Sequence, residues 1–271
     1  MKLANNKLAI KLAVNGLKVS EKELDSDFKR LDKSYLSVQA YIKNIANGEL
    51  RSLIVNGPPG VGKSAMVEKF LKEHKSSTQK FVSGHMTLLS LYHNLYQHKD
   101  KGQVLVLDDV DSIFSKTEGL NILKAAMDTT RQRRISWESN TMMLSELGLP
   151  KVFNFNGSVV LITNVGFGGA MTKQMAHLNA LKDRSYCIPI ADGGIQSAYK
   201  QIAYMVIKHD ILAEYHLTDA VKAKILDYIL NNLDNLYTVS LRTAIKLAEI
   251  YRLNPTGWRK DADVAFLRHS N

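Results

Sequence analysis

The segment GPPGVGKS, from Gly57 to Ser64, is the feature that most constrains the fold of this chain. It fits the spacing G-x-x-x-x-G-K-[S/T], in which backbone N–H groups wrap around a phosphate. The apolar run LRSLIV precedes it, and the helical run SAMVEKFLKEH follows it. A glycine-rich loop between a strand and a helix N-terminus is a ready-made anion site. The segment therefore predicts an α/β fold that binds a nucleoside triphosphate.

Each position of this loop has an expected role. Lys63 is expected to reach the β- and γ-phosphates, and the Ser64 hydroxyl is expected to ligate Mg²⁺. We therefore predict ATP and Mg²⁺ as cofactors. The predicted nucleotide-binding residues are Gly57, Pro58, Pro59, Gly60, Val61, Gly62, Lys63, Ser64 and Ala65.

Strand and helix patterns alternate along the first two thirds of the chain. A helical pattern covers about residues 23–46, and continuous apolar runs follow at intervals. Such runs are typical of a parallel sheet that helices cover on both faces. RISWES and KVFNFN alternate apolar and polar residues, which predicts that they pair as a hairpin. The predicted strands of the parallel sheet lie in LRSLIV, QKFVSG, KGQVLVLD, SVVLITN and SYCIPI.

The composition changes after Asp192-Gly193-Gly194, where strand patterns end. We therefore predict an N-terminal extension (1–25), an α/β nucleotide-binding base (26–193) and a small helical lid (194–271). The fold class is a parallel sheet between helices, with an all-helical C-terminal domain. The helical patterns of the lid cover about 196–209, 219–233, 240–252 and 260–268.

Three acidic residues follow the apolar run Val104–Leu107 in VLVLDDVDS. Phosphate-loop enzymes place a carboxylate at the tip of a neighbouring strand to hold Mg²⁺. Asp108 ends the run and is the predicted metal-side residue. Asp109 is predicted to orient and polarise the attacking water as general base. For Asp111 the favoured interpretation is an N-cap of the next segment.

These motifs together resemble those of the AAA+ ATPases. GPPGVGKS, VLVLDD, SVVLITN and the helical C-terminal region carry the resemblance over about residues 30–252. Asp-Asp stands where most members have Asp-Glu. The bacterial replication-initiator branch of the family shows the same departure. The compact single module is also similar to AAA+ proteins encoded by phages. The resemblance implies an oligomeric Mg²⁺-dependent ATPase, with a ring or an open ring as the assembly.

The resemblance also implies three further site residues. Asn164, at the end of SVVLITN, matches sensor 1, and its alternative is a turn residue. Arg184, in LKDRSYCIPI, matches the arginine finger that acts on a neighbouring subunit, and its alternative is a solvated helix-end arginine. Arg242, in SLRTAIKLAEI, matches sensor 2, and its alternative is a surface arginine of the lid.

The net charge of +10 favours a polyanionic partner. Before Gly194 the chain holds 26 basic and 18 acidic residues. RQRRISW offers Arg131, Arg133, Arg134 and Trp137 for phosphate contact and base stacking, which favours action on DNA. The alternative is a basic helix end with Trp137 in the core. A protein remodeller is the second functional class, and a nucleotide-gated adaptor with little hydrolysis is the third.

The composition and the N-terminal sequence indicate in which cellular compartment the protein is expected. Cys187 is the single cysteine, which excludes an intramolecular disulfide and a cysteine-cluster metal site. Lys and Asn interrupt the N-terminal apolar residues too often for a secretory signal, and no apolar run reaches the roughly 20 residues of a membrane helix. We therefore expect a cytoplasmic protein without a membrane partner.

Overall fold

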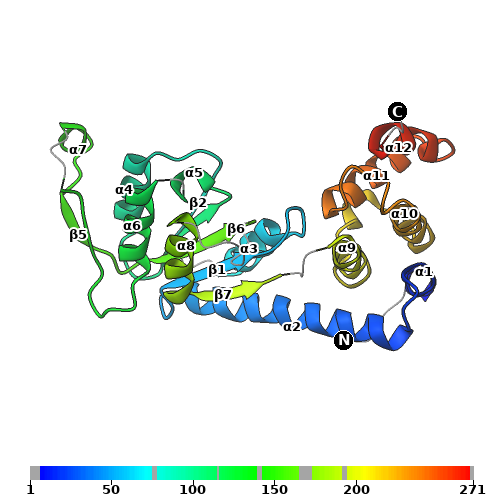
Figure 1. The fold of residues 1–271 in the computed structure, drawn as a ribbon, viewed down its shortest axis with the longest axis horizontal. Helices are drawn as coiled ribbons and strands as arrows, with labels where there is room; N and C mark the ends of the chain where they lie inside the picture. Colours follow the sequence, from blue (N-terminus) through cyan, green and yellow to red (C-terminus); the bar gives the residue numbers. More distant parts are fainter. Residues whose placement is uncertain are drawn as a thin grey trace. The chain divides into compact units, whose positions relative to one another are not determined.

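The computed structural model describes residues 7–74, 78–114, 116–138, 142–164, 173–190 and 194–268. The chain divides into two compact units (Figure 1). The sheet unit comprises residues 35–57 and 63–189, and the helical unit comprises residues 1–34, 58–62 and 190–271. The boundary predicted at residue 193 lies outside the described residues.

Five parallel strands form the sheet, in the spatial order β2-β3-β6-β1-β7. Because all the strands are parallel, their carboxyl ends share one edge of the sheet and their amino ends share the other. Each apolar run predicted as a strand forms one. The strands are β1 (Ser52–Asn56), β2 (Thr78–Ser83), β3 (Gln103–Asp108), β6 (Ser158–Thr163) and β7 (Tyr186–Pro189).

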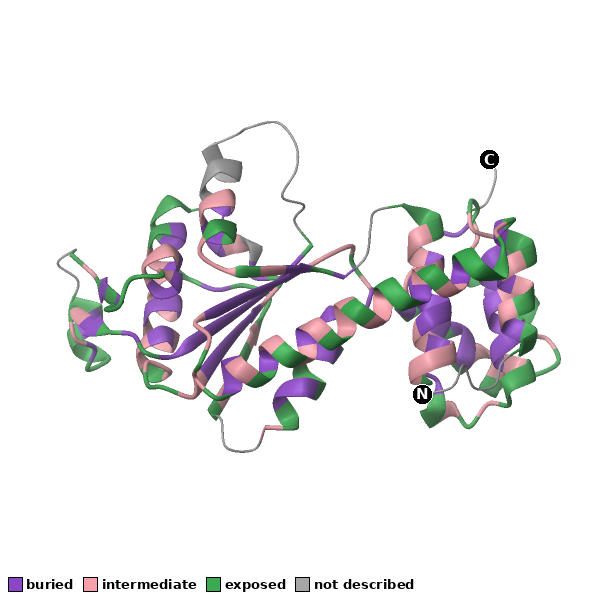
Figure 2. Ribbon diagram, turned by 90° about the horizontal axis from the view of Figure 1, so that it is seen from below, coloured by how far each residue is buried: buried purple, intermediate pink, exposed green. Residues whose placement is uncertain are grey.

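Helices cover both faces of this sheet, so that its central strands are buried (Figure 2). Leu105, Leu107 and Leu161 belong to one apolar cluster with residues of α4 and α6. Successive strand residues point to opposite faces, so Val104 and Val106 face the other side. The fold class predicted from the sequence is confirmed. The helices are α2 (Glu21–Ala46), α3 (Lys63–Lys72), α4 (Leu88–Gln97), α5 (Asp111–Phe114), α6 (Thr117–Met127) and α8 (Lys173–Asp183).

The predicted hairpin also forms. β4 (Arg134–Ser136) pairs antiparallel with β5 (Val152–Asn154), and α7 (Met142–Glu146) lies between them in the chain. The hairpin packs on the sheet unit through aromatic rings, since the ring of Tyr92 lies 5.4 Å from that of Trp137 and 5.1 Å from that of Phe153. The Tyr92 hydroxyl donates to the carbonyl of Pro150 (2.9 Å), and burial raises its pKa to about 12.

The helical unit contains the helices predicted for the lid. Thr218 and Ser240 cap two of them, because their side chains accept hydrogen bonds from the N–H groups of Val221 and Thr243. Its helices are α9 (Ile195–His209), α10 (Asp219–Asn231), α11 (Leu241–Leu253) and α12 (Trp258–Phe266), with a 3-10 turn at Ala213–Tyr215.

The stretch predicted as an N-terminal extension contributes to the core of this unit. Helix α1 (Lys7–Leu17) buries Ala9 and Ala13 completely and packs along α10. A Cβ atom at Gly16 would lie 2.2 Å from the side chain of Leu230, so this glycine permits the close approach of the two helices. Among the described residues, no helix is long and apolar enough to cross a membrane.

Candidate nucleotide-binding site

The phosphate loop connects the end of β1 to the start of α3, as its sequence predicts. Gly60 and Gly62 have φ angles of +71° and +91°, a conformation that side chains with a Cβ atom adopt at a cost. Lys63 opens α3 and is 5% exposed, whereas Ser64 and Ala65 are exposed in the first turn of the helix. The helix N-terminus therefore presents a hydroxyl group, and the lysine is held inside.

Lys63 is the start of a chain of hydrogen bonds across the carboxyl edge of the sheet. Its Nζ donates to the carbonyl of Gly57 (2.9 Å) and to Oδ1 of Asn164 (2.7 Å). The Nδ2 of Asn164 in turn donates to Oδ1 of Asp109 (2.9 Å). Residues from the phosphate loop, from the end of β6 and from the end of β3 thus meet, as their positions after parallel strands require.

Asp108 and Asp109 occupy different environments although they are adjacent. Asp108 is the last residue of β3, lies opposite Ile162 in the register with β6, and is half-buried. Asp109 is exposed, and its N–H donates to the carbonyl of Ile162 (3.1 Å). Its φ angle of +50° is uncommon for a residue other than glycine. Backbone strain of this kind costs about 1–3 kcal/mol and is frequent at functional sites.

Asp111 lies at the start of α5, and its side chain is outside the described part of the chain. The capping role predicted for it therefore remains a prediction.

The middle of the phosphate loop packs within the helical unit. The N–H of Leu241 donates to the carbonyl of Gly60 (2.8 Å), and the Nε2 of Gln201 donates to the carbonyl of Val61 (3.3 Å). A cavity of about 410 Å³ opens beside these contacts. Its lining includes Pro58, Pro59 and Gly60 together with Arg242 of α11. The structure thus brings the residue matched to sensor 2 to the same cavity as part of the loop.

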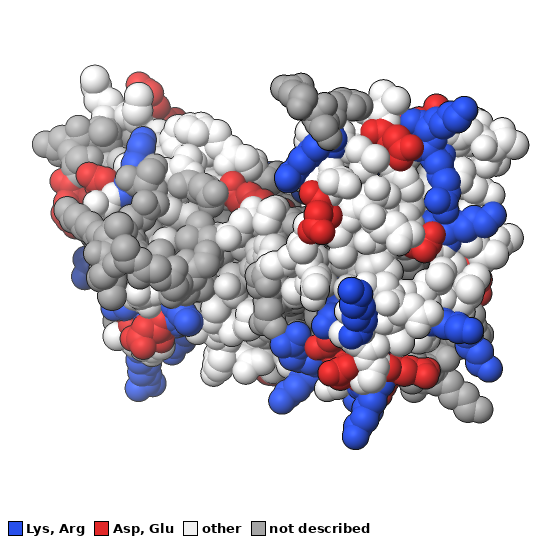
Figure 3. All heavy atoms as spheres, turned by 45° about the vertical axis from the view of Figure 1, so that its right-hand side comes forward, with Lys and Arg blue, Asp and Glu red and all other residues white. Residues whose placement is uncertain are grey.

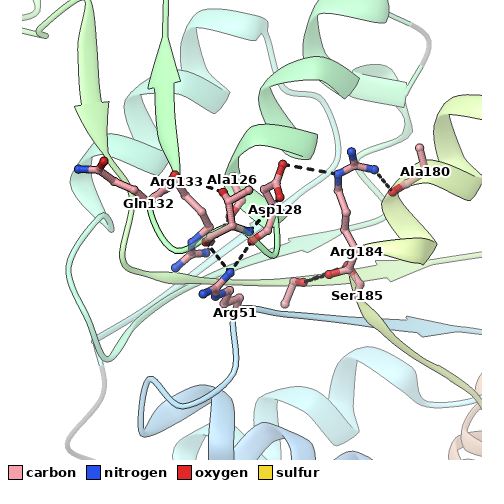
Figure 4. A network of polar contacts seen from close by, with 10 residues as sticks. Arg51, Ala126, Asp128, Gln132, Arg133, Ala180, Arg184 and Ser185 are labelled. Atoms are coloured by element: carbon pink, nitrogen blue, oxygen red, sulfur yellow. Dashed lines mark hydrogen bonds and ion pairs between the residues drawn. The ribbon is translucent and has the colours of Figure 1, made fainter.

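Arg184 lies at the other edge of the sheet, where the strands begin. Its Nη1 donates to the carbonyl of Ala180 (2.9 Å), and its Nε lies 3.9 Å from Oδ2 of Asp128. Ser52, the first residue of β1, donates to the carbonyl of Arg184 (3.2 Å) and so anchors it at the amino edge (Figure 4). Arg184 is therefore not part of the hydrogen-bond chain that Lys63 begins.

The structure corrects the predicted DNA-contacting set at Arg133. This residue is 7% exposed, and its guanidinium donates to the carbonyls of Ala126 (2.8 Å) and Gly157 (2.9 Å). It also lies over the ring of Phe155 at 5.0 Å. Burial lowers its pKa to about 10, with a smaller contribution from the charge of Arg51. Arg133 supports the packing of the hairpin, and its guanidinium is buried against main-chain carbonyls.

The remaining members of this set divide between surface and interior. Arg131 and Arg134 are exposed. Trp137 is half-buried against Tyr92, and its Nε1 is buried without a hydrogen-bond partner in the described part of the chain. On the face drawn in Figure 3, Lys and Arg side chains are interspersed with Asp and Glu. The charge surplus is therefore not gathered into a single basic area on that face.

The sequence did not point to two residues at the amino edge, Arg51 and Asp128. Arg51 precedes β1 and Asp128 follows α6, so neither belongs to a phosphate-binding motif. A weak signal was present in the segment Asp128-Thr129-Thr130, because Asp side chains often accept a hydrogen bond from the backbone N–H two residues later. That bond is present here, from Thr130 (3.0 Å).

Comparison with known proteins agrees with this geometry. The AAA family, described as "ATPase family associated with various cellular activities", matches residues 53–165. An uncharacterized 36.7 kDa protein from the nrdC–mobD intergenic region of Enterobacteria phage T4 is 32% identical over 259 residues, covering 93% of this chain and 79% of the phage protein. The chain belongs to the AAA+ family of ATPases.

Two solved structures match most of this chain at low sequence identity. The RuvB Holliday junction branch migration motor of Thermotoga maritima matches with a TM-score of 0.47 and 14% identity, covering 89% of this chain and 67% of RuvB. A DNA replication initiation factor matches with a TM-score of 0.45 and 13% identity, covering 86% of this chain and 64% of that protein.

Proposed function

We propose that this protein hydrolyses ATP in a Mg²⁺-dependent reaction. The observation that carries the proposal is the hydrogen-bond chain from Lys63 through Asn164 to Asp109. In the proposed reaction, Lys63 holds the β- and γ-phosphates and Asn164 contacts the γ-phosphate or the attacking water. Asp109 accepts the proton of that water. The bond between Asn164 and Asp109 supports the assignment of both side chains to one water.

The donor atoms near the phosphate loop suit magnesium. Mg²⁺ keeps several waters and is usually bound by one or two carboxylates together with substrate phosphates. The Ser64 hydroxyl and the Asp108 carboxylate would hold it in that way. Among the described residues there is no cluster of three or more His, Cys, Asp or Glu side chains for a metal, so an all-protein cage is not part of the proposal. When bound, Mg²⁺ would neutralise charge on the phosphates.

Arg184 is proposed to act on the nucleotide of a neighbouring subunit. The strand β1 has five residues, so the two edges of the sheet are about 16 Å apart at about 3.3 Å per residue. A guanidinium at the amino edge does not span this distance to the loop at the carboxyl edge. The proposed assembly is therefore a ring or open ring in which each Arg184 contacts the nucleotide of the next subunit. Arg242 is proposed as sensor 2 within its own subunit.

ATP turnover with and without Mg²⁺, measured on the full chain and on Asp109→Asn, tests the hydrolysis. We expect turnover that EDTA abolishes, and we expect nucleotide binding without turnover for Asp109→Asn. Turnover that persists in the variant would remove Asp109 from the role of base. Asp100→Asn is a matched control, because Asp100 is an exposed acid before β3.

We propose DNA as the client of this ATPase. Arg131 and Arg134 support this proposal, because both are exposed at the base of the hairpin and the chain has a net charge of +10. The test is the ATPase rate with single- and double-stranded DNA at two salt concentrations. Stimulation that fades with salt would support DNA, because phosphate contacts weaken as salt rises. The double variant Arg131→Gln/Arg134→Gln is expected to lose the stimulation.

A protein client is the second candidate, and the tip of the hairpin favours it. Met142 is 84% exposed, Met143 is 58% exposed and Leu147 is 48% exposed. Adjacent exposed apolar side chains are more typical of a protein contact than of a phosphate contact. ATPase activity that is indifferent to DNA and that survives in the arginine double variant would favour this class.

A further inference from the structure

The amino edge of the sheet carries a polar network that the proposed chemistry does not yet explain. Arg51 donates to the main-chain carbonyl of Asp128, Arg184 lies beside the carboxylate of Asp128, and the charge of Arg133 lies near that of Arg51 (Figure 4). These residues precede or follow four different elements, so the network is assembled only when the sheet unit folds. Arg133 has a structural role in the hairpin, as described above.

Asp128 is fixed in place from two sides. The Nη1 of Arg51 donates to the carbonyl of Asp128 (3.1 Å) and to that of Thr130 (2.7 Å), which holds the turn after α6 against the start of β1. The backbone N–H of Thr130 donates to Oδ1 of Asp128 (3.0 Å). The main chain therefore determines the direction of this carboxylate, and its Oδ2 atom faces Arg184.

The contact between Asp128 and Arg184 is an ion pair without a hydrogen bond. The distance of 3.9 Å between Oδ2 and Nε exceeds that of a hydrogen bond. The Nε atom is buried, and it has no hydrogen-bond partner among the residues that the structure describes. Nη1 is held by Ala180, and the other amino group points away from both Asp128 and Ala180 (Figure 4). The side chain as a whole is 32% exposed.

We propose that Asp128 is a positioning residue for Arg184. Its fixed carboxylate attracts the Arg184 guanidinium at Nε, which leaves the second amino group of Arg184 directed outward, toward a nucleotide of the adjacent subunit. Arg51 acts indirectly, because its hydrogen bonds hold the turn that contains Asp128. This inference rests on the proposed function, in which Arg184 acts as an arginine finger.

A double-mutant cycle on ATP turnover tests this role. The variants are Asp128→Asn, Arg184→Ala and the double variant, with Asp183→Asn as a control at an exposed acid next to Arg184. Asparagine keeps an oxygen for the N–H of Thr130 and removes only the charge, which preserves the turn. We expect Asp128→Asn to lower kcat roughly two- to fivefold with KM unchanged, as expected for a partly exposed ion pair.

The cycle separates positioning from folding. If Asp128 acts through Arg184, Asp128→Asn has no further effect on kcat in the Arg184→Ala background. Asp128→Glu keeps the charge but not the short side chain that the turn requires, so it is expected to restore part of the lost turnover. Two results would overturn the positioning role alone. One is an equal loss of kcat from Asp128→Asn in the unsubstituted protein and in Arg184→Ala. The other is an unchanged kcat in Asp128→Asn when Arg184→Ala is impaired. An unchanged kcat in Arg184→Ala would overturn the finger itself, and with it the role of Asp128.

Discussion

The two edges of one parallel sheet carry two polar networks of opposite character. At the carboxyl edge, Lys63, Asn164 and Asp109 bond to one another mainly through side chains, and Asn164 and Asp109 are exposed. At the amino edge, the guanidinium groups of Arg51 and Arg184 donate to main-chain carbonyls. The first network has the acceptors and the cation that a phosphate and a water would engage. The second holds cations at a distance from that site.

This difference indicates how one fold serves two nucleotides in the proposed assembly. The carboxyl edge collects strand-end residues because parallel strands finish together, so it suits the subunit's own nucleotide. The amino edge carries residues that begin strands. Arg184 at this edge lies at least one strand length from the phosphate loop. The difference between the edges is therefore the basis of the proposed division into groups acting in cis and a group acting in trans.

The largest expected effect comes from the amino edge. Arg184→Ala is expected to lower kcat roughly 10³- to 10⁵-fold, because an arginine finger stabilises charge that develops only in the transition state. Steady-state ATP turnover at saturating nucleotide measures it. Lys182→Ala, which removes an exposed cation two residues earlier, is the control and is expected to leave kcat unchanged. Comparable losses in the two variants would indicate a non-specific charge effect.

The next effect belongs to the carboxyl edge. Asp109→Asn is expected to lower kcat roughly 10²- to 10⁴-fold, the usual contribution of a general base. Nucleotide affinity is expected to stay within about twofold, because the amide still accepts from Nδ2 of Asn164. Single-turnover kinetics together with equilibrium binding separate the two quantities. A variant that loses affinity and keeps its single-turnover rate would place Asp109 in binding and not in chemistry.

Lys63→Ala is expected to weaken ATP binding roughly 100-fold, since charge-assisted hydrogen bonds to phosphate contribute about 1.5–3 kcal/mol each. Fluorescent-nucleotide titration measures the affinity. Lys72→Ala is a matched control at the other end of α3, where the exposed lysine pairs with Glu68. Unchanged affinity in Lys63→Ala would contradict the assignment of the loop to phosphate binding.

The smallest effect on catalysis, and a clear one on stability, is expected at Arg133. Arg133→Met removes two buried hydrogen bonds and is expected to cost about 2–4 kcal/mol, or roughly 5–15 °C in Tm. Thermal unfolding followed by circular dichroism measures it. Arg131→Met at the exposed neighbour is expected to change Tm by less than about 2 °C. Equal stability of the two variants would contradict the buried position of Arg133.

The parallel sheet and the phosphate loop were predictable because their signals are local. GPPGVGKS determines its own turn, and each continuous apolar run was long enough to indicate a buried strand. The hairpin was predictable for the same reason, since RISWES and KVFNFN alternate with a period of two. The meeting of Lys63, Asn164 and Asp109 followed from the edge that parallel strands share.

The rest depended on packing between residues far apart in the chain. RQRRISW does not distinguish Arg133, whose partners are carbonyls at Ala126 and Gly157, from the exposed Arg131. The alternation that buries Ile135 places Arg133 on the same face, but a charged residue is rarely buried unless it is paired, and its partners could not be read from the sequence. The contribution of α1 to the helical unit also depends on a distant partner, because Gly16 meets Leu230 more than 200 residues later.

Mixing two inactive variants tests the division between the edges most directly. Subunits carrying Arg184→Ala keep a complete carboxyl edge, and subunits carrying Asp109→Asn keep a complete amino edge. In a mixed assembly, some interfaces then combine an intact Asp109 with an intact Arg184 from the neighbour. We expect ATP turnover in the mixture to exceed that of either variant alone at the same total concentration. Turnover no higher than the average of the two would contradict the action of Arg184 on an adjacent subunit.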